Sequence, residues 1–369
     1  MKRLFLGTTV GLAMLAAAGT PCGATELQVV PAIAPLAGVR VPTEKDLAAY
    51  LFVFFRDEDH SIHFATSTDG YRFTDVNGAR PVLLGKDIAE QKGVRDPHIM
   101  RGPDNAFYMS MTDLHIFAQR EGLRSTQWER PKEYGWGNNR GLILMKSYDL
   151  IHWTHAEVHP GELFPAYGDI GAAWAPETIF DTKKNKLMVY YTTRVKGGDN
   201  HMVYSYANDA FTTLETAPRP LFTYPKPGKS TIDGDITRVG GKYHLFYVAH
   251  DTPGGLRHAA SDRINGGYTF EPGKVDPENV PCEAPMLWRR IGTHTYVLMY
   301  DVFGAKPNNM GFSETKDFVT YKNLGRFNDP GSPMKATNFT GPKHGAVMPI
   351  TAAELARLQA YFGTKPATR

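Results

Sequence analysis

The chain has 369 residues, of which 42% are hydrophobic and 21% charged, and its formal net charge is +3. These values are ordinary for a soluble globular protein, and no basic stripe indicates a nucleic-acid partner. With 36 Gly and 26 Pro, turns are frequent, as many short strands require.

The first 24 residues have the pattern of a secretory signal peptide. Lys2 and Arg3 precede an apolar run, and a small-residue stretch ends at Ala24, where we expect cleavage. The apolar run is too short to span a membrane, and Cys22 does not stand in a lipobox. We therefore predict a periplasmic or secreted protein that has no membrane association after cleavage. Cleavage leaves Cys282 as the only cysteine, which we expect to pack as a small hydrophobe.

Residues 25–48 read as a leader and residues 49–369 as a single domain built from repeats. One short motif recurs five times at a period of about 50 residues, which is a signature of propellers. Its third position is occupied in turn by Asp96, Pro176, Asp233, Glu283 and His344, within the stretches VRDPHIM, WAPETIF, TIDGDIT, PCEAPML and PKHGAVM. Most copies run through a turn into a strongly apolar strand. We therefore predict an all-β, five-bladed β-propeller whose first strands bring these residues to one axial pocket.

A second pattern ends each unit with an apolar strand and an Asp in a turn. We expect these Asp side chains to bond their own backbone and to have no catalytic role; they are Asp69, Asp149, Asp209, Asp262 and Asp317. The unit at 49–74 lacks a motif-bearing first strand, and the stretch around His344 lacks following strands, because TAAELARLQAYF reads as a short helix. Pairing of the C-terminal strand with the N-terminal unit would close the ring.

A polar insert, FAQREGLRSTQWERPKEYGWGNNR, interrupts the second unit. Long loops of this kind often rim binding sites. Trp136 lies between two glycines of the insert and is a candidate for stacking on a sugar, whereas Trp153 sits at a recurring strand end and is expected to pack.

The three acidic side chains can form a hydrolytic site. Two carboxylates that flank a glycosidic bond can hydrolyse it, one as acid and one as base. Asp96 and Glu283 fit these roles, and Asp233 would raise the pKa of Glu283 because the two charges repel. Any one of them alone would more often be an ordinary turn residue, but three in register on channel-lining strands favour a site.

The ordered set RDP, WAPE, IDGD, CEAP and KHG resembles glycoside hydrolase family 43, whose members are five-bladed propellers that invert configuration. The resemblance covers nearly all of the chain after the leader. It implies that Asp96 is the general base, Asp233 the pKa modulator and Glu283 the general acid, and that Trp174 lines the sugar subsite.

The sequence departs from this family pattern at two positions. Gly234 replaces the proline after the modulator and is followed by Asp235, and Glu177 replaces the aspartate of WAPD. We take Glu177 and Asp235 as further substrate-binding candidates. The chemistry needs no cofactor, but a histidine at the position of His344 often reaches an axial calcium ion in this family, so we take His344 as a candidate metal ligand.

The resemblance favours an exo-acting inverting enzyme that releases terminal α-L-arabinofuranose from plant-type oligosaccharides or polysaccharides. β-D-galactofuranose and β-D-xylose remain open as alternative sugars. A retaining fructan-type hydrolase is disfavoured because no DPNG-like motif precedes Asp96. A glycan-binding propeller without activity is the non-enzymatic alternative, and three clustered acids argue against it. Oligomeric state is not predicted.

Overall fold

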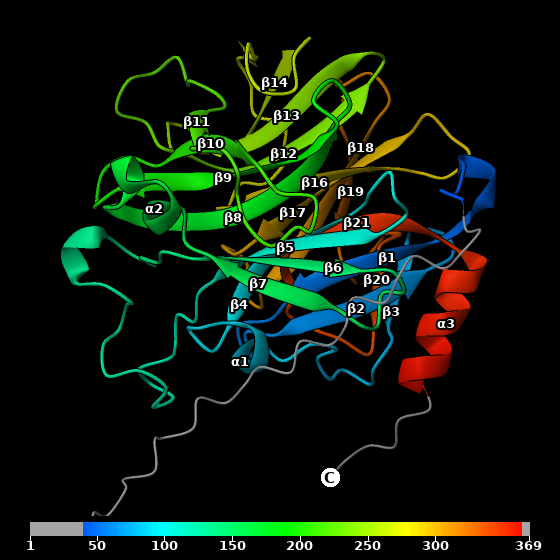
Figure 1. The fold of residues 1–369 in the computed structure, drawn as a ribbon. Coiled ribbons are helices and arrows are strands. Elements are labelled where there is room, and N and C mark those ends of the chain that lie inside the picture. Colours follow the sequence, from blue (N-terminus) through cyan, green and yellow to red (C-terminus); the bar gives the residue numbers. More distant parts are fainter. Residues whose placement is uncertain (1–39, 364–369) are drawn as a thin grey trace, which may run out of the picture. The chain divides into compact units, whose positions relative to one another are not determined.

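The computed structural model describes residues 40–363, so the expected signal peptide and most of the leader lie outside the described part. Five sheets, four of them antiparallel and one mixed, form the blades of a propeller (Figure 1). One blade combines the first and last strands of the described chain: β1 (Leu47–Phe55), β2 (Ile62–Ser67), β3 (Arg72–Asp75), β20 (Lys335–Thr337) and β21 (Lys343–Thr351). This confirms the predicted all-β propeller.

The other four blades have four strands each. They are β4 (Val94–Arg101), β5 (Phe107–Asp113), β6 (Leu142–Ser147) and β7 (Thr154–Val158); β8 (Ile170–Asp181), β9 (Lys186–Val195), β10 (His201–Tyr206) and β11 (Arg219–Pro220); β12 (Thr231–Val239), β13 (Lys242–Ala249), β14 (Gly255–Ser261) and β15 (Thr269–Glu271); and β16 (Glu283–Arg289), β17 (Tyr296–Val302), β18 (Asn309–Thr315) and β19 (Lys322–Arg326). The five repeated motifs lie on β4, β8, β12, β16 and β21.

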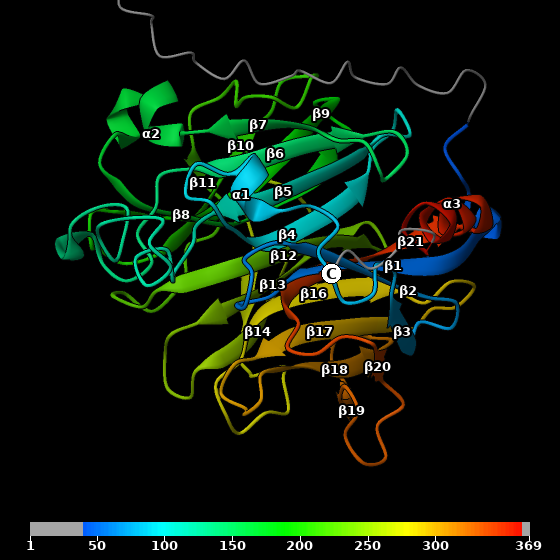
Figure 2. The same ribbon diagram turned by 90° about the horizontal axis from the view of Figure 1, so that it is seen from below.

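The ring closes as expected, because β21 pairs antiparallel with β1, with Val347 opposite Phe52. Figure 2 shows the red C-terminal strand beside the blue N-terminal strand. One detail differs from the expected four-stranded blades. Strand β20 adds in parallel to β3 and gives this blade a fifth strand, which covers an edge that would otherwise be open.

The core lies between neighbouring sheets. The second strand from the axis is buried over most of its length in every blade, and each contains fully buried apolar residues such as Leu51, Met109, Val189, Leu245 and Leu298. These strands are buried on both faces and therefore read as continuous apolar runs rather than as alternating patterns. The five stacked sheets hold the ends of the axial strands in fixed positions.

The predicted C-terminal helix is α3 (Ala352–Gly363), which contacts β1 and β21. Glu354 of this helix accepts two hydrogen bonds from the Arg101 guanidinium of β4, at 2.8 and 2.7 Å, and both side chains are about 10% exposed. The remaining helices are single turns: α1 (Gly85–Ile88), α2 (Pro160–Leu163), η1 (Glu44–Asp46), η2 (Lys132–Tyr134) and η3 (Pro165–Tyr167). Between residues 40 and 363, no helix has the length and apolar character needed to cross a membrane.

The expected Asp turns form at three of the five positions. Asp69, Asp149 and Asp317 each accept backbone N–H bonds from residues two and three positions later. The expectation is wrong for Asp209 and Asp262, because Asn208 and Ser261 accept the backbone N–H bonds at those turns.

Two expectations about the core are confirmed. Trp153 packs against the main apolar cluster. Cys282 is a buried free thiol, and burial raises its pKa, so it is inert as a nucleophile at neutral pH.

Candidate active site

Each axial strand carries an irregularity inside the repeated motif. The pairing register shifts between Arg95 and His98 on β4, and equivalent shifts occur on β8, β12 and β16. On β21 the register skips His344, because Gly345 pairs with Phe54 and Lys343 with Phe55. A β-bulge of this kind bends the strand and re-aims a side chain. The five bulges lie at corresponding places around the ring and turn side chains into the channel.

Four of the bulges contain a non-glycine residue in the left-handed region. These are Asp96, Ala175, Asp233 and Ala284, with φ of 54°, 44°, 53° and 59°. Each is followed by Pro97, Pro176, Gly234 or Pro285. A proline is tolerated there because a bulge interrupts the ladder of backbone hydrogen bonds. Such backbone strain costs about 1–3 kcal/mol per residue and is typically found at functional sites.

This geometry corrects the sequence alignment of the repeats. Asp96 and Asp233 occupy the left-handed position, but Glu283 lies one residue earlier in its motif, at the position of Arg95 and Trp174. The Pro or Gly that follows the left-handed residue was the signal for the correct register. His344 takes the left-handed residue's place, as the inter-blade hydrogen bonds show. The backbone N–H groups of Ala175, Asp233 and His344 each donate to the preceding blade, to Thr112, Thr192 and Asp301 respectively.

The three candidate carboxyl groups meet in one pocket of about 60 Å³. Its lining combines the residues at and just before the bulges with two side chains from loops: Arg95, Asp96, Leu114, Trp136, Trp174, Ile232, Asp233, Glu283 and His344. The structure therefore brings together Asp96, Asp233, Glu283, His344, Trp136 and Trp174, as the sequence led us to expect.

Asp96 of β4 pairs with His344 of β21, which belongs to the neighbouring blade. His344 Nδ1 lies 3.3 Å from Asp96 Oδ1, and Thr112 Oγ1 donates to Asp96 Oδ2 at 2.7 Å. Burial acts to raise the pKa of Asp96, but the hydrogen bond and charge of His344, with Arg95 and Thr112, hold this pKa at about 2. Burial acts to lower the pKa of His344, but Asp96, Asp233 and Glu283 raise it to about 9. At neutral pH the pair is an imidazolium and a carboxylate.

The pKa values of the other two acids, Glu283 and Asp233, are raised, whereas that of Asp96 is lowered. Burial and the charges of Asp233 and Asp301 raise the pKa of Glu283 to about 8. Burial, together with the charge of Asp96, raises the pKa of Asp233 to about 6 against the opposing charge of His344. At pH 7, Glu283 carries a proton while Asp96 does not. Two carboxyl groups whose environments separate their pKa values are a mark of acid–base assignment.

Sequence reasoning missed a second set of charges at the pocket. Asp301 is the cross-strand partner of Glu283, and its carboxylate lies 3.1 Å from Lys343 Nζ. Arg95 lines the pocket and donates to Asp57 at 2.9 Å. Asp301 ends the apolar run TYVLMYD, and Arg95 and Lys343 stand next to motif positions, so their place beside the motif was the available signal.

Glu177 and Asp235 do not line the pocket, which corrects their assignment as substrate-binding residues. Both are 3% exposed. Tyr190 donates its hydroxyl to Glu177 at 2.7 Å, and the Leu287 N–H donates to Asp235 at 2.9 Å. With His98 they form a buried group whose ligand atoms lie within 4.8 Å of one another. Burial raises the pKa of both carboxyl groups. Because their hydrogen-bond partners lie on neighbouring strands, the two side chains connect the axial strands to one another and to β9.

The tryptophans form one wall of the pocket. The ring centroids of Trp136 and Trp174 are 6.0 Å apart, and Trp174 Nε1 donates to Gly137 at 2.9 Å. Arg194 lies over the Trp174 ring at 4.4 Å and donates to the Trp136 carbonyl at 2.7 Å. These contacts fix the polar insert against β8, while the Trp136 side chain remains 59% exposed. An exposed aromatic face at a pocket mouth suits contact with a sugar ring.

The donor set around His344 does not fit a hard cation. Calcium takes six to eight oxygen ligands, whereas His344 offers a ring nitrogen and faces one carboxylate, that of Asp96, at 3.3 Å. No chemical step below depends on an ion, and the axial calcium stays a prediction.

The sequence of the chain is similar to a known protein family and to a curated enzyme. A family model described as a probable glycosyl hydrolase domain, related to glycoside hydrolase family 43, matches residues 45–356. An α-L-arabinofuranosidase of Bifidobacterium longum subsp. longum is 24% identical over 215 residues, which is 55% of this chain and 19% of that protein. The chain thus spans about a fifth of the length of this curated relative.

Similar solved structures are more distant in sequence than this curated relative. An endo-arabinase from Bacteroides thetaiotaomicron VPI-5482 superimposes with a TM-score of 0.54 at 13% identity, covering 75% of this chain and 95% of that one. An α-L-arabinofuranosidase from Clostridium thermocellum ATCC 27405 gives a TM-score of 0.49 at 13% identity, covering 73% of this chain and 84% of that one.

Proposed function

From the premise that the chain belongs to the glycosyl hydrolase family related to glycoside hydrolase family 43, we propose that it is an exo-acting inverting glycosidase that releases terminal α-L-arabinofuranose. The observation that carries the proposal is the pocket in which an ionised Asp96 and a protonated Glu283 meet. An acid and a base in complementary protonation states at the same pH are what inversion requires.

In the proposed mechanism, the bond between the anomeric carbon and the leaving oxygen breaks as Glu283 donates its proton to that oxygen. A water molecule attacks the opposite face of the sugar, and Asp96 accepts its proton. Asp233 keeps the pKa of Glu283 high through its negative charge. Proton exchange with solvent then restores Glu283 and Asp96.

The choice of sugar is supported by the matched α-L-arabinofuranosidase and by a small pocket walled by Trp136 and Trp174, which suits one terminal residue. β-D-Xylose and β-D-galactofuranose are the alternatives.

The expected secretion of the protein would bring the enzyme into contact with plant-type polysaccharides outside the cytoplasm. N-terminal sequencing of the exported protein tests the expected signal peptide.

The test is a panel of aryl glycosides of the three sugars, with the anomeric proton of the first-formed sugar followed by NMR. We expect turnover of the arabinofuranoside and inverted product, with Asp96→Asn, which lacks the candidate base, as the control of low activity. Retained configuration would contradict the mechanism. Turnover of the xyloside alone would replace the sugar, and binding without turnover of any glycoside would favour a glycan-binding propeller.

A further inference from the structure

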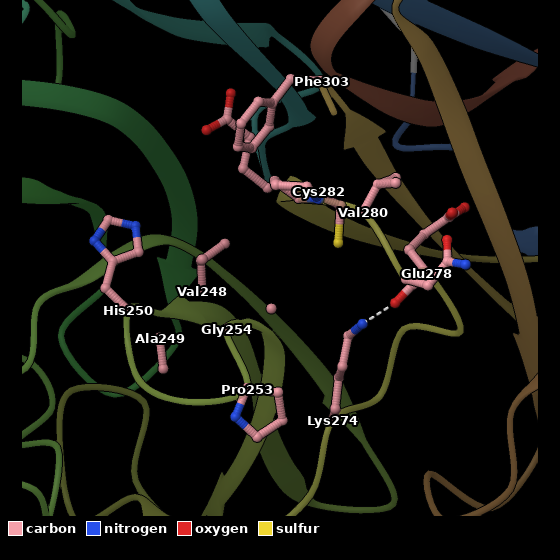
Figure 3. A pocket seen from close by; sticks show the side chains of 14 residues that line it. Val248, Ala249, His250, Pro253, Gly254, Lys274, Glu278, Val280, Cys282 and Phe303 are labelled. Atoms are coloured by element: carbon pink, nitrogen blue, oxygen red, sulfur yellow. Dashed lines mark hydrogen bonds between the residues drawn. The ribbon is translucent and has the colours of Figure 1, made fainter. Parts of the chain in front are cut away.

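A second cavity, of about 490 Å³, lies next to the catalytic pocket. It is formed where β13 and the start of β14 face the loop before β16 and the residue that follows β17 (Figure 3). Its volume falls in the range of about 300–1,000 Å³ that is typical of small-molecule sites. Glu283 lines both this cavity and the catalytic pocket, whereas Asp96 lines only the latter.

The position of Glu283 gives the two cavities different roles. A general acid must reach the oxygen that joins the scissile sugar to the leaving group. The scissile sugar has to lie with Asp96 and Asp233, because the attacking water approaches from the side of the base. The leaving group then extends past Glu283 on its other side. We propose that the 490 Å³ cavity binds the sugar unit that leaves, an inference that rests on the proposed function.

The lining of the cavity has the chemistry of a sugar site. Phe303 is 37% exposed, and Val248 and Val280 add further apolar surface. Figure 3 shows the Phe303 ring at one side of the cavity and Pro253 at the opposite side. An aromatic ring offers its face to the C–H side of a sugar. Phe303 is therefore the residue that we assign to contact with the leaving sugar.

Two polar side chains are available for its hydroxyl groups. Within residues 40–363, the His250 ring and the Asn279 amide take part in no hydrogen bond, although both line the cavity. Burial lowers the pKa of His250, so its neutral ring has one donor and one acceptor. A few polar groups in a largely apolar cavity are the usual means of orienting a ligand.

The loop that forms the cavity is held in place by charges. Lys274 lies 2.8 Å from Asp276 and donates to the Glu278 carbonyl, as the dashed line in Figure 3 marks. Arg326 Nε donates to the Glu278 carboxylate at 3.2 Å. A cavity fixed before the ligand arrives loses less conformational entropy on binding.

The experiment compares Phe303→Ala with the control Val319→Ala, an exposed apolar residue of the same blade that lines neither cavity. Two substrates are used: an arabino-oligosaccharide, whose leaving group is a sugar, and arabinofuranosyl fluoride, whose leaving group is too small to fill the cavity. We expect Phe303→Ala to lower kcat/KM on the oligosaccharide at least about tenfold, chiefly through KM. The change on the fluoride stays within about twofold, and Val319→Ala matches the wild type on both.

An equal loss on both substrates, or no loss on the oligosaccharide, overturns the inference while leaving the proposed function intact. If the wild type hydrolyses neither substrate, the proposed function fails, and binding then decides the inference. Titration calorimetry of the oligosaccharide with Glu283→Gln, alone and combined with Phe303→Ala, is expected to show at least about tenfold weaker binding in the combined variant. Equal binding would overturn it.

Discussion

The imidazole of His344 and the carboxylate of Asp96 lie 3.3 Å apart, although one belongs to the last strand and the other to the first strand of the next blade. This contact sets the charge of the candidate base, because the protonated ring lowers the pKa of Asp96 to about 2. The same contact raises the pKa of His344 to about 9. The strand that closes the ring therefore also supplies the charge that keeps Asp96 ionised.

Replacing the base leaves a site that binds sugar but turns over slowly. Asp96→Asn keeps the shape of the side chain and removes its basicity, so we expect turnover to fall by roughly 10²–10⁴-fold. In Asp96→Gly, azide needs no general base and is expected to yield a glycosyl azide of inverted configuration, detectable by NMR and mass spectrometry. Near-native turnover by Asp96→Asn would mean that the base lies elsewhere.

Removing the acid has an effect that depends on the leaving group. Glu283→Ala is expected to reduce kcat/KM by roughly 10²–10⁴-fold on substrates with poor leaving groups, which need protonation in the transition state. Activated aryl glycosides are expected to lose much less. The measurement is a series of aryl glycosides of graded leaving-group pKa, and equal losses along the series would contradict the assignment of Glu283.

The alkaline side of the pH profile reports Glu283. Activity requires the protonated acid, so kcat/KM is expected to fall as pH rises through about 8. The negative charge of Asp233 contributes to this raised pKa, so Asp233→Asn lowers it and moves the alkaline limb to lower pH. Asp209→Asn is the control, because Asp209 is exposed and pairs with Lys186 away from the pocket. An alkaline limb that does not move in Asp233→Asn would show that Asp233 does not set the pKa of Glu283.

The charge of His344 affects catalytic activity at acidic pH and the stability of the fold at alkaline pH. In His344→Gln the pKa of Asp96 rises, so the acidic limb of kcat/KM moves to higher pH. For stability, the folded-state pKa of His344 is raised, so its contribution is complete below the unfolded value of about 6.5 and is lost as pH rises through about 9. Unfolding midpoints measured from pH 6 to 10 are expected to fall more steeply for the wild type than for His344→Gln. Parallel curves would contradict this.

The contact between α3 and β4 supplies a stability prediction that is independent of the chemistry. Arg101→Met leaves the buried carboxylate of Glu354 without its partner, and we expect a loss of about 3–5 kcal/mol in the free energy of unfolding. Arg72→Met is the matched control, because the Arg72–Asp69 pair is exposed and contributes about 0–1 kcal/mol. Urea titration of both variants checks the difference, and losses of similar size would mean that burial of the pair adds nothing.

The propeller could be predicted from the sequence because its repeats carry strong local signals. The five motifs, the apolar second strands and the helix after residue 351 identified the blades and the closing strand. The same signals identified Asp96, Asp233 and Glu283, which line one pocket.

The register of Glu283 and the orientation of Asp235 and Glu177 could not be predicted, because they depend on β-bulges that break the alternation of side chains along a strand. A bulge shifts the register by one residue, so Glu283 was aligned with the wrong position and Asp235 was placed on the pocket face. Both Asp235 and Glu177 find partners in neighbouring strands, which only the assembled sheets reveal. The cavity beside Glu283 is formed by the end of β13, the start of β14, the loop before β16 and the residue after β17, and no repeated motif marks these segments in the sequence.

The closing strand also has a consequence for biosynthesis. A nascent chain that has emerged as far as residue 326 already contains Asp96, Asp233 and Glu283, yet it lacks the imidazolium that keeps Asp96 ionised. Without β21, the inner edge of the N-terminal sheet is also unpaired. We therefore expect hydrolytic competence to appear only when the final strand docks, as a single late event, and not to accumulate blade by blade during translation.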